Sequence, residues 1–157
     1  MMSTPDISDK FPELPCLVEF NSYGARSVFE GEVVTVVCPD DNSLAKELIS
    51  QKGDGKILFI EGNASKAVAL LGDILAQQAL DNNWSGVVVN GMVRDVEILK
   101  TIPFPIYALG SCPKKSNKKN AGNINVDVCI DGVDIKPSFW SYGDETGILI
   151  SPKKLEL

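Results

Sequence analysis

The chain has 157 residues, of which 44% are hydrophobic and 23% charged, a composition typical of a globular protein with a hydrophobic core. It contains no histidine, which excludes Ser-His-Asp and Cys-His catalysis, and its net charge of −6 argues against a nucleic-acid-binding protein. No apolar run reaches the about 18 residues that span a bilayer, and the first residues lack the apolar segment of a secretory signal, so we expect a cytoplasmic protein.

The four cysteines lie far apart in the sequence, and none belongs to a C-x-x-C pair: Cys16, Cys38, Cys112 and Cys129. Zinc binds clustered cysteine and histidine side chains, so this spacing does not favour a zinc site. We expect these cysteines to be small buried side chains or unreactive thiols in a reducing cytoplasm.

The first two thirds of the chain are predicted to alternate strands and helices. A polar N-terminal arm is expected over residues 1–15, because Pro5, Pro12 and Pro15 interrupt regular structure. Apolar, β-branched runs predict strands, and amphipathic runs with polar starts predict helices. The expected elements are a strand at 28–37, a helix at 43–51 that Ser43 caps, a strand at 56–60, a helix at about 65–82, a strand at 86–90, a loop at 91–95, a short helix at 96–100 and a strand at 106–109.

Gly72 lies inside the predicted helix 65–82, where glycine is unfavourable, and indicates a break with a new helix start at Asp73.

Farther along, the polar run SCPKKSNKKNAGN contains four lysines: Lys114, Lys115, Lys118 and Lys119. Its composition predicts a solvated loop. The alternative is a source of positive potential that attracts anionic substrates.

The last part of the chain has the pattern of antiparallel strands. Residues 125–130 and 133–136 alternate apolar and polar side chains around Asp131-Gly132, a strong hairpin signal, and further strands are expected at 139–142 and 147–150. The βαβαβ order of the first part predicts parallel strands. We therefore predict one α/β domain over residues 1–157, with a mixed central sheet or barrel.

Residues Gly62–Glu97 contain the set of side chains best suited to chemistry. In open α/β folds ligands bind at the carboxyl ends of the strands, where the loops after 56–60 and 86–90 should meet. Twenty residues, 74 to 93, separate Asp73 from Arg94-Asp95. Two carboxylates suit a hard cation such as Mg²⁺, and arginine offers a planar fork to a substrate carboxylate. A helix start at Gly72–Leu75 would present free N–H groups to an anion.

Each of these side chains also has an ordinary structural interpretation. Asp73 is an acid in the first turn of a helix, where the helix dipole favours it. Asp95 would be an N-cap, and Arg94 would pair with Glu97 on the surface. The spacing alone leaves both interpretations open.

Three segments, ALLGDILAQQAL, NNWSGVVVNGMVRDVEIL and YGDETGILISP, resemble the RraA-like family, and the likeness extends from about Phe20 to Pro152. This family includes class II 4-hydroxy-4-methyl-2-oxoglutarate aldolases and the regulators of ribonuclease E activity. The resemblance implies a compact swivelling domain of β/β/α type. It also implies assembly as a homotrimer or hexamer, with sites near the subunit interfaces.

The resemblance further implies roles for particular residues. Asp95 matches the direct ligand of a divalent cation, Mg²⁺ or Mn²⁺, and Asp73 matches the acid that reaches this metal through water. Arg94 matches the substrate-binding arginine, and these three are the implied catalytic residues. The backbone stretch that holds the substrate carboxylate matches Gly72, Asp73, Ile74 and Leu75.

The activity implied by the resemblance is a metal-dependent lyase that cleaves 4-hydroxy-4-methyl-2-oxoglutarate to pyruvate, with oxaloacetate decarboxylation through the same pyruvate enolate. Without histidine, water is the expected base. The alternative is a non-catalytic regulator that binds and inhibits ribonuclease E through an acidic surface. Asp95 favours chemistry, because regulators of this family can lack it. A methyltransferase is disfavoured, since no G-x-G-x-G loop follows the first strand.

Overall fold

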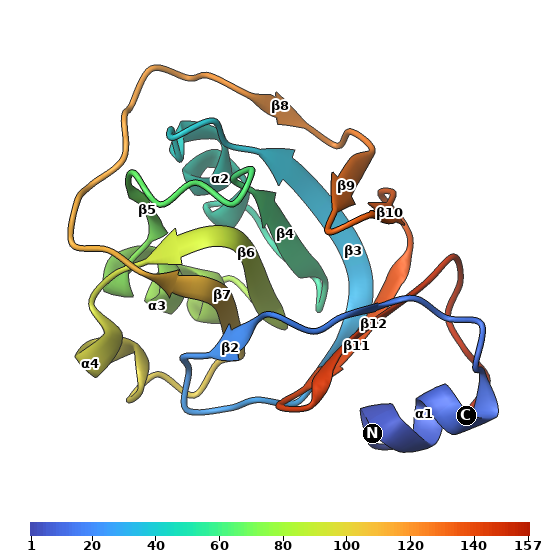
Figure 1. The fold of residues 1–157 in the computed structure, drawn as a ribbon. Helices are drawn as coiled ribbons and strands as arrows, with labels where there is room; N and C mark the ends of the chain where they lie inside the picture. The colour runs from blue at the N-terminus through green and yellow to red at the C-terminus, as the bar shows by residue number, and fades with distance from the viewer.

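The computed structural model describes all 157 residues and is built on one strongly curled, mixed sheet (Figure 1). Its central strands run parallel in the order β3, β4, β6, β7, as the βαβαβ pattern predicted. They are rich in valine and isoleucine because both of their faces are covered, one by helices and the other by antiparallel strands of the chain. Their bounds are β3 (Phe29–Val37), β4 (Ile57–Glu61), β6 (Gly86–Val93) and β7 (Ile106–Ser111).

The antiparallel part of the sheet continues from β3 through β11 (Trp140–Asp144) and β12 (Gly147–Ser151) to β1 (Cys16–Leu17). At the other edge, β2 (Asn21–Ser22) pairs with β7, so residues 18–20 cross from one edge strand to the other. The sheet thereby curls into a half-barrel, which confirms the predicted fold class.

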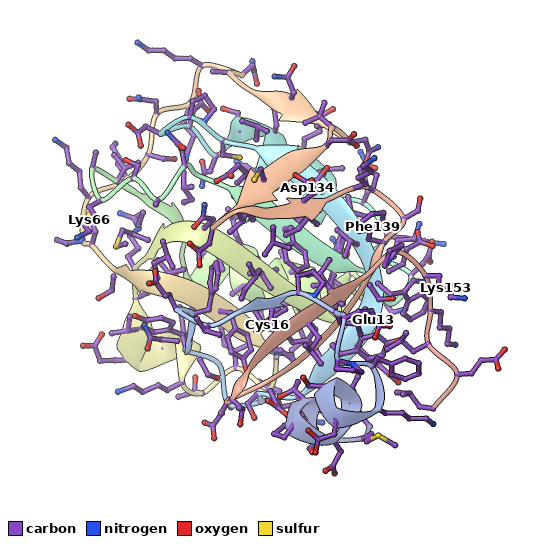
Figure 2. The ribbon with its side chains drawn as sticks, turned by 45° about the vertical axis from the view of Figure 1, so that its right-hand side comes forward. Glu13, Cys16, Lys66, Asp134, Phe139 and Lys153 are labelled. Carbon is purple, nitrogen blue, oxygen red and sulfur yellow. The ribbon has the colours of Figure 1, made fainter.

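A hairpin of β9 (Val128–Ile130) and β10 (Val133–Ile135) lies beside the curled sheet, and its register confirms the turn predicted at Asp131-Gly132. Figure 2 shows Cys16 in β1, just before the crossing segment, and Asp134 in this hairpin. Of the strands outside the main order, β8 (Asn123–Ile124) pairs with β3. Apolar side chains of the hairpin and of the inner sheet face form one core.

Three helices form the second layer, with a larger core between them and the outer sheet face. They are α2 (Ser43–Ile49), α3 (Asp73–Asp81) and α4 (Val96–Leu99). No helix is long and apolar enough to cross a membrane. Among the four free cysteines only Cys38 is buried in this core, where burial raises the pKa of its thiol to about 11, whereas Cys16 and Cys129 are exposed.

The helix predicted over residues 65–82 is wrong in its first half. Residues Ala69–Leu71 instead form the short strand β5, which pairs in parallel with β6, and α3 begins only after Gly72. All three residues of β5 are buried, so pairing with the end of β6 overrides the helical spacing of the apolar side chains. The predicted new helix start at Asp73 is confirmed, and β6 runs on to Val93 instead of ending at Asn90.

The N-terminal segment, expected to be an arm without regular structure, contains the helix α1 (Thr4–Lys10). Pro5 fits its first turn, where a missing N–H group costs nothing, and the Ser3 side chain accepts a hydrogen bond from the Asp6 N–H group at 3.3 Å. The helix buries Ile7 against the β11–β12 side of the sheet.

Asp144 fastens α1 to the sheet. Its carboxylate accepts hydrogen bonds from the Thr4 N–H group at 2.8 Å, the Thr4 hydroxyl at 2.6 Å and the Thr146 N–H group at 3.0 Å. Burial by itself would raise the pKa of Asp144, but these hydrogen bonds outweigh it and lower the pKa. A carboxylate with a lowered pKa stabilises the fold above the pKa of the unfolded chain, and this contribution is lost as the pH falls through the folded pKa.

We therefore expect Asp144→Asn to lower the free energy of unfolding by about 1–3 kcal/mol at neutral pH. The difference from the original protein should shrink when urea unfolding is repeated at a pH below the ordinary pKa of aspartate, about 3.9, because the contribution of the Asp144 carboxylate is lost as the pH falls. Equal destabilisation at both pH values would contradict this account of Asp144.

Candidate active site

Backbone pairing brings the two sequence segments of the candidate site together. Strand β5 pairs with the end of β6, and the Arg94 N–H group donates to the Leu71 carbonyl at 3.0 Å. Residues 72–73 therefore lie beside residues 94–95. The strands β4 and β6 are neighbours as expected, but Gly62 lies in a turn that donates to the Asn90 carbonyl and does not line the site.

Asp95 connects the two segments directly. Its Oδ2 atom accepts a hydrogen bond from the Asp73 N–H group at 3.1 Å, at the first residue of α3. Asp95 also occupies the N-cap position of α4, but its side chain makes no capping bond there. Its backbone is left-handed, with φ of 59°, a conformation that aspartate tolerates at a cost and that often marks functional positions.

Gly72 is required by the close approach of this carboxylate. A Cβ atom at position 72 would lie 2.6 Å from Asp95 Oδ2, well inside normal contact distance. The backbone of Gly72 is extended, with φ of −131°, so any residue could adopt its conformation. The space for the Asp95 carboxylate, and not backbone freedom, therefore explains the glycine.

Gly72→Ala should displace the Asp95 carboxylate from the Asp73 N–H group and reduce activity at this site about tenfold or more. The free energy of unfolding should change little, because the methyl group displaces only the end of a side chain. The matched control is Gly91→Ala, where the nearest atom to an added Cβ is an ordinary 3.4 Å away. Equal losses in both variants, in an assay for the pyruvate release that the family resemblance implies, would argue against this role of Gly72.

The start of α3 presents backbone donors beside these carboxylates. The first hydrogen bond within the helix is from the Ala76 N–H group to the Gly72 carbonyl, at 3.1 Å. The N–H groups of Ile74 and Leu75 therefore have no acceptor inside the helix and can bind an anion, whose charge the helix dipole favours. The Ile74 side chain is 77% exposed at this point.

Arg94 is not engaged by any carboxylate. The chain has a single ion pair, between Lys56 and Glu32, so the surface pair of Arg94 with Glu97 is not formed. The only hydrogen bond of the Arg94 guanidinium is to the Pro113 carbonyl, at 3.4 Å. Most of its donors are therefore free to bind a ligand.

These groups line one pocket of about 150 Å³, a volume that admits a small organic molecule. The pocket brings together Gly72, Asp73, Ile74, Leu75, Arg94 and Asp95, which were the predicted site residues. It also contains residues that were not predicted. The lining residues are Asn42, Lys46, Ala69, Leu71, Gly72, Asp73, Ile74, Leu75, Arg94, Asp95, Lys115, Ser116 and Lys118.

Two lysines of the polar run reach the pocket, which supports the interpretation of that run as a source of positive potential. The Lys118 ammonium donates to Asn42 Oδ1 and, at 3.0 Å, to Ser116 Oγ. Burial lowers the pKa of Lys118, and the charge of nearby Lys46 lowers it further. The Asn42 side chain is 6% exposed, and its amide nitrogen donates to the Leu70 carbonyl at 3.0 Å. Asn42 therefore links Lys118 to the segment before Gly72.

The residues of the pocket fit a hard divalent cation. Asp73 and Asp95 both line it, and carboxylate oxygens are the ligands that Mg²⁺ and Mn²⁺ prefer. No group of three or more acidic, histidine or cysteine side chains is arranged to hold a metal by itself. A cation here would take its other ligands from water and substrate, as Mg²⁺ commonly does.

The fold and this site define a member of a known family. A model of the RraA-like family, described as Aldolase/RraA, matches residues 4–150. The chain belongs to the RraA-like family.

Similar proteins carry three different names. A curated relative from Hahella chejuensis is 41% identical over 98% of this chain and 95% of its own, with the provisional name 4-hydroxy-4-methyl-2-oxoglutarate aldolase. The solved RNA-processing inhibitor RraA from Thermus thermophilis is 38% identical, with a TM-score of 0.96 over 99% of this chain and 96% of its own. A solved S-adenosylmethionine:2-dimethylmenaquinone methyltransferase from Geobacillus kaustophilus is 36% identical, with a TM-score of 0.95 over 98% of this chain and 97% of its own.

Proposed function

We propose that this protein is a divalent-metal-dependent lyase that cleaves 4-hydroxy-4-methyl-2-oxoglutarate to pyruvate and also decarboxylates oxaloacetate. The observation that carries the proposal is the contact of the Asp95 carboxylate with the Asp73 N–H group, beside an unpaired Arg94 in the same small pocket. The names of the aldolase relatives support the same reaction class.

Binding of the substrate starts from the backbone. The free N–H groups of Ile74 and Leu75 would hold the C1 carboxylate of a 2-oxo acid, next to the Arg94 guanidinium. Asp95 would hold Mg²⁺ or Mn²⁺ directly and Asp73 through water. When bound, this cation would polarise the 2-keto group as a Lewis acid.

In the cleavage step, water removes the proton of the C4 hydroxyl group, and the C3–C4 bond breaks. The electron pair of that bond moves to C3 and the C2 oxygen, which gives one pyruvate as its enolate and one as the ketone. Arg94 stabilises the negative charge that develops on the C2 oxygen. Protonation of C3 releases the second pyruvate. Oxaloacetate loses CO₂ from the same position, so one site serves both reactions.

The charges around the pocket support a substrate with two carboxylates. Four positive side chains line it against the carboxylates of Asp73 and Asp95, and these are Lys46, Arg94, Lys115 and Lys118. A pocket with this excess of positive charge attracts a dianion more strongly than a monoanion. We assign Lys118 to the substrate, because its ammonium is held in place by Asn42 and Ser116.

Removal of the metal tests the proposal directly. Treatment with EDTA should reduce pyruvate release from both substrates to the uncatalysed rate, and added Mg²⁺ or Mn²⁺ should restore it. The measurement couples pyruvate to lactate dehydrogenase after the chelator has been removed by desalting. Full activity of the metal-free protein would contradict the metal assignment.

We further propose a homotrimer or hexamer. Ile74 and Ile98, which are 77% and 48% exposed, lie together beside the pocket at the α3–α4 surface. A neighbouring subunit would cover these side chains and close one side of the site. Light scattering after size-exclusion chromatography tests this, and a monomer at micromolar concentration would contradict it.

A second candidate function is regulation of ribonuclease E. It is favoured by the RraA neighbour, which matches nearly the whole chain and is named an inhibitor of RNA processing. The net charge of −6 suits a basic partner. Pull-down with purified ribonuclease E tests it. Binding that Asp95→Ala does not change would support a regulatory surface separate from the site.

A further inference from the structure

The loop that carries Lys118 has no helix or strand of its own. Residues 112–122 connect β7 to β8, and most of their side chains are exposed. An exposed loop with this composition is ordinarily mobile, so a lysine on it would not hold one position. Lys118 nevertheless donates a hydrogen bond to Asn42, outside the loop, as well as one to Ser116 within it. The loop must therefore be anchored elsewhere.

Backbone hydrogen bonds of Cys112 and Lys114 hold the start of the loop, and the anchor around Lys118 is the carboxylate of Asp41. Asp41 is only 1% exposed and does not line the pocket. Its Oδ2 atom accepts hydrogen bonds from the Lys119 N–H group at 2.6 Å and the Ala121 N–H group at 3.4 Å. Its Oδ1 atom accepts from the Ser43 N–H group at 2.9 Å and the Ser43 hydroxyl at 2.6 Å. One buried carboxylate thus ties the start of α2 to a loop nearly 80 residues away.

A second link reinforces this anchor. The Ser43 hydroxyl accepts a hydrogen bond from the Asn120 N–H group at 3.2 Å, and the Asn117 N–H group donates to the Asp40 carbonyl at 2.9 Å. Residues on both sides of Lys118 are therefore held by the segment that also supplies Asn42 to the pocket. The hydrogen bonds to Asp41 outweigh its burial and lower the pKa of its carboxyl to about 2, so the anchor stays charged through the physiological range.

We propose that Asp41 is a positioning residue of the active site: its buried carboxylate holds the 117–121 loop so that the Lys118 ammonium lies in the pocket. The proposal rests on the proposed lyase function for its effect on catalysis. Asp41 itself does not touch the substrate. Its contribution comes through the place of Lys118, in the way that groups behind a functional side chain orient it.

Asp41→Asn is the central variant. The amide keeps the size of the side chain but has one acceptor oxygen instead of two, so it cannot hold both the Ser43 side and the Lys119–Ala121 side. We expect kcat/KM for oxaloacetate to fall about tenfold to a hundredfold. The matched control is Asp144→Asn, which removes a similar carboxylate anchor far from the pocket and should leave kcat/KM unchanged.

A double-mutant cycle separates positioning from a general loss of structure. Lys118→Met should lower kcat/KM by itself, and Asp41→Asn should then have less than a twofold further effect, because the lysine it positions is gone. Independent, multiplying losses from the two substitutions would overturn the proposal.

The pKa of Lys118, followed through its ¹³Cε NMR signal and assigned with Lys118→Met, gives a readout that does not depend on catalysis. If Asp41→Asn frees the loop, Lys118 leaves the desolvated and positively charged pocket, and its pKa rises toward the ordinary value for lysine. If Asp41 acts only as a nearby negative charge, the same substitution lowers the pKa of Lys118 further. A fall, or no change, would overturn the proposal.

The positioning role of Asp41 can still be tested if the original protein is inactive or if Asp41→Asn does not fold. If the original protein releases no pyruvate, the lyase function fails, whereas the NMR titration still tests the positioning by Asp41. If Asp41→Asn does not fold, Ser43→Ala removes only the hydroxyl bonds to Asp41 and Asn120. It should then raise the pKa of Lys118 by a smaller amount, and an unchanged pKa would count against the anchor.

Discussion

Asp95→Ala is expected to lower kcat for pyruvate release by at least about 10³-fold with both substrates. Asp95 is the proposed direct metal ligand, and its carboxylate also accepts the Asp73 N–H group at 3.1 Å. The alanine variant therefore loses the metal and the contact that joins the two segments of the site. Added Mg²⁺ should not restore activity, and steady-state kinetics across a range of Mg²⁺ concentrations measures this.

Asp95→Asn separates the loss of the metal from the loss of the contact with the Asp73 N–H group. Its amide oxygen can still accept the Asp73 N–H group, and asparagine tolerates the left-handed backbone at this position. We expect this variant to fold like the original protein yet to lose nearly as much activity as the alanine variant. Glu97→Gln is the control, since Glu97 is an exposed acid two residues away that does not line the pocket. Full activity of Asp95→Asn at saturating Mg²⁺ would contradict the metal role.

Arg94→Lys is expected to reduce kcat about 10²- to 10³-fold. Lysine keeps the positive charge but loses the planar fork that binds a carboxylate or an enolate oxygen through two N–H groups. The free energy of unfolding should change by less than about 0.5 kcal/mol, because no carboxylate pairs with Arg94 in the fold. Urea unfolding and pyruvate release, measured on the same preparation, test both expectations.

The chain provides its own control for this substitution. Arg26 is the only other arginine, and it is exposed and does not line the pocket. Arg26→Lys should leave both activity and stability unchanged. A large loss of stability in Arg94→Lys would show that Arg94 is a structural residue, and its effect on kcat would then need no catalytic explanation.

Much of the fold could be predicted from local patterns, because strands and helices with strong periodicity keep their form in the folded chain. The parallel strands, the helices at 43 and 96 and the final hairpins are examples. Strand β5 could not be predicted, since the short apolar run Ala69–Leu71 fits a helix and a strand equally well. Only its pairing with β6 determines that it is a strand. Helix α1 was missed for a similar reason: Pro5 disrupts a helix interior but fits its first turn.

The candidate site was predicted in part. Arg94 and Asp95 gave a signal because they follow a predicted strand, and Asp73 gave one because Gly72 indicated a helix start there. Lys118 gave a signal only as one of four lysines that could attract anionic substrates. Asn42 and Ser116 gave none, because nothing in the sequence shows that a lysine-rich loop folds back onto a segment 76 residues earlier. The tight turn CPDDN, with two adjacent acids before a helix, was the only available hint of Asp41.

The left-handed backbone of Asp95 has an evolutionary consequence. Glycine and asparagine adopt φ of 59° readily, and aspartate tolerates it, whereas β-branched or bulky residues do not. Gly72 leaves room for the side chain of Asp95, which a Cβ at position 72 would obstruct. A lineage could therefore replace Asp95 by asparagine or glycine and keep the scaffold while losing the charge. A metal-binding member and a purely protein-binding member of this family would then stand one substitution apart, with the same fold and the same surface.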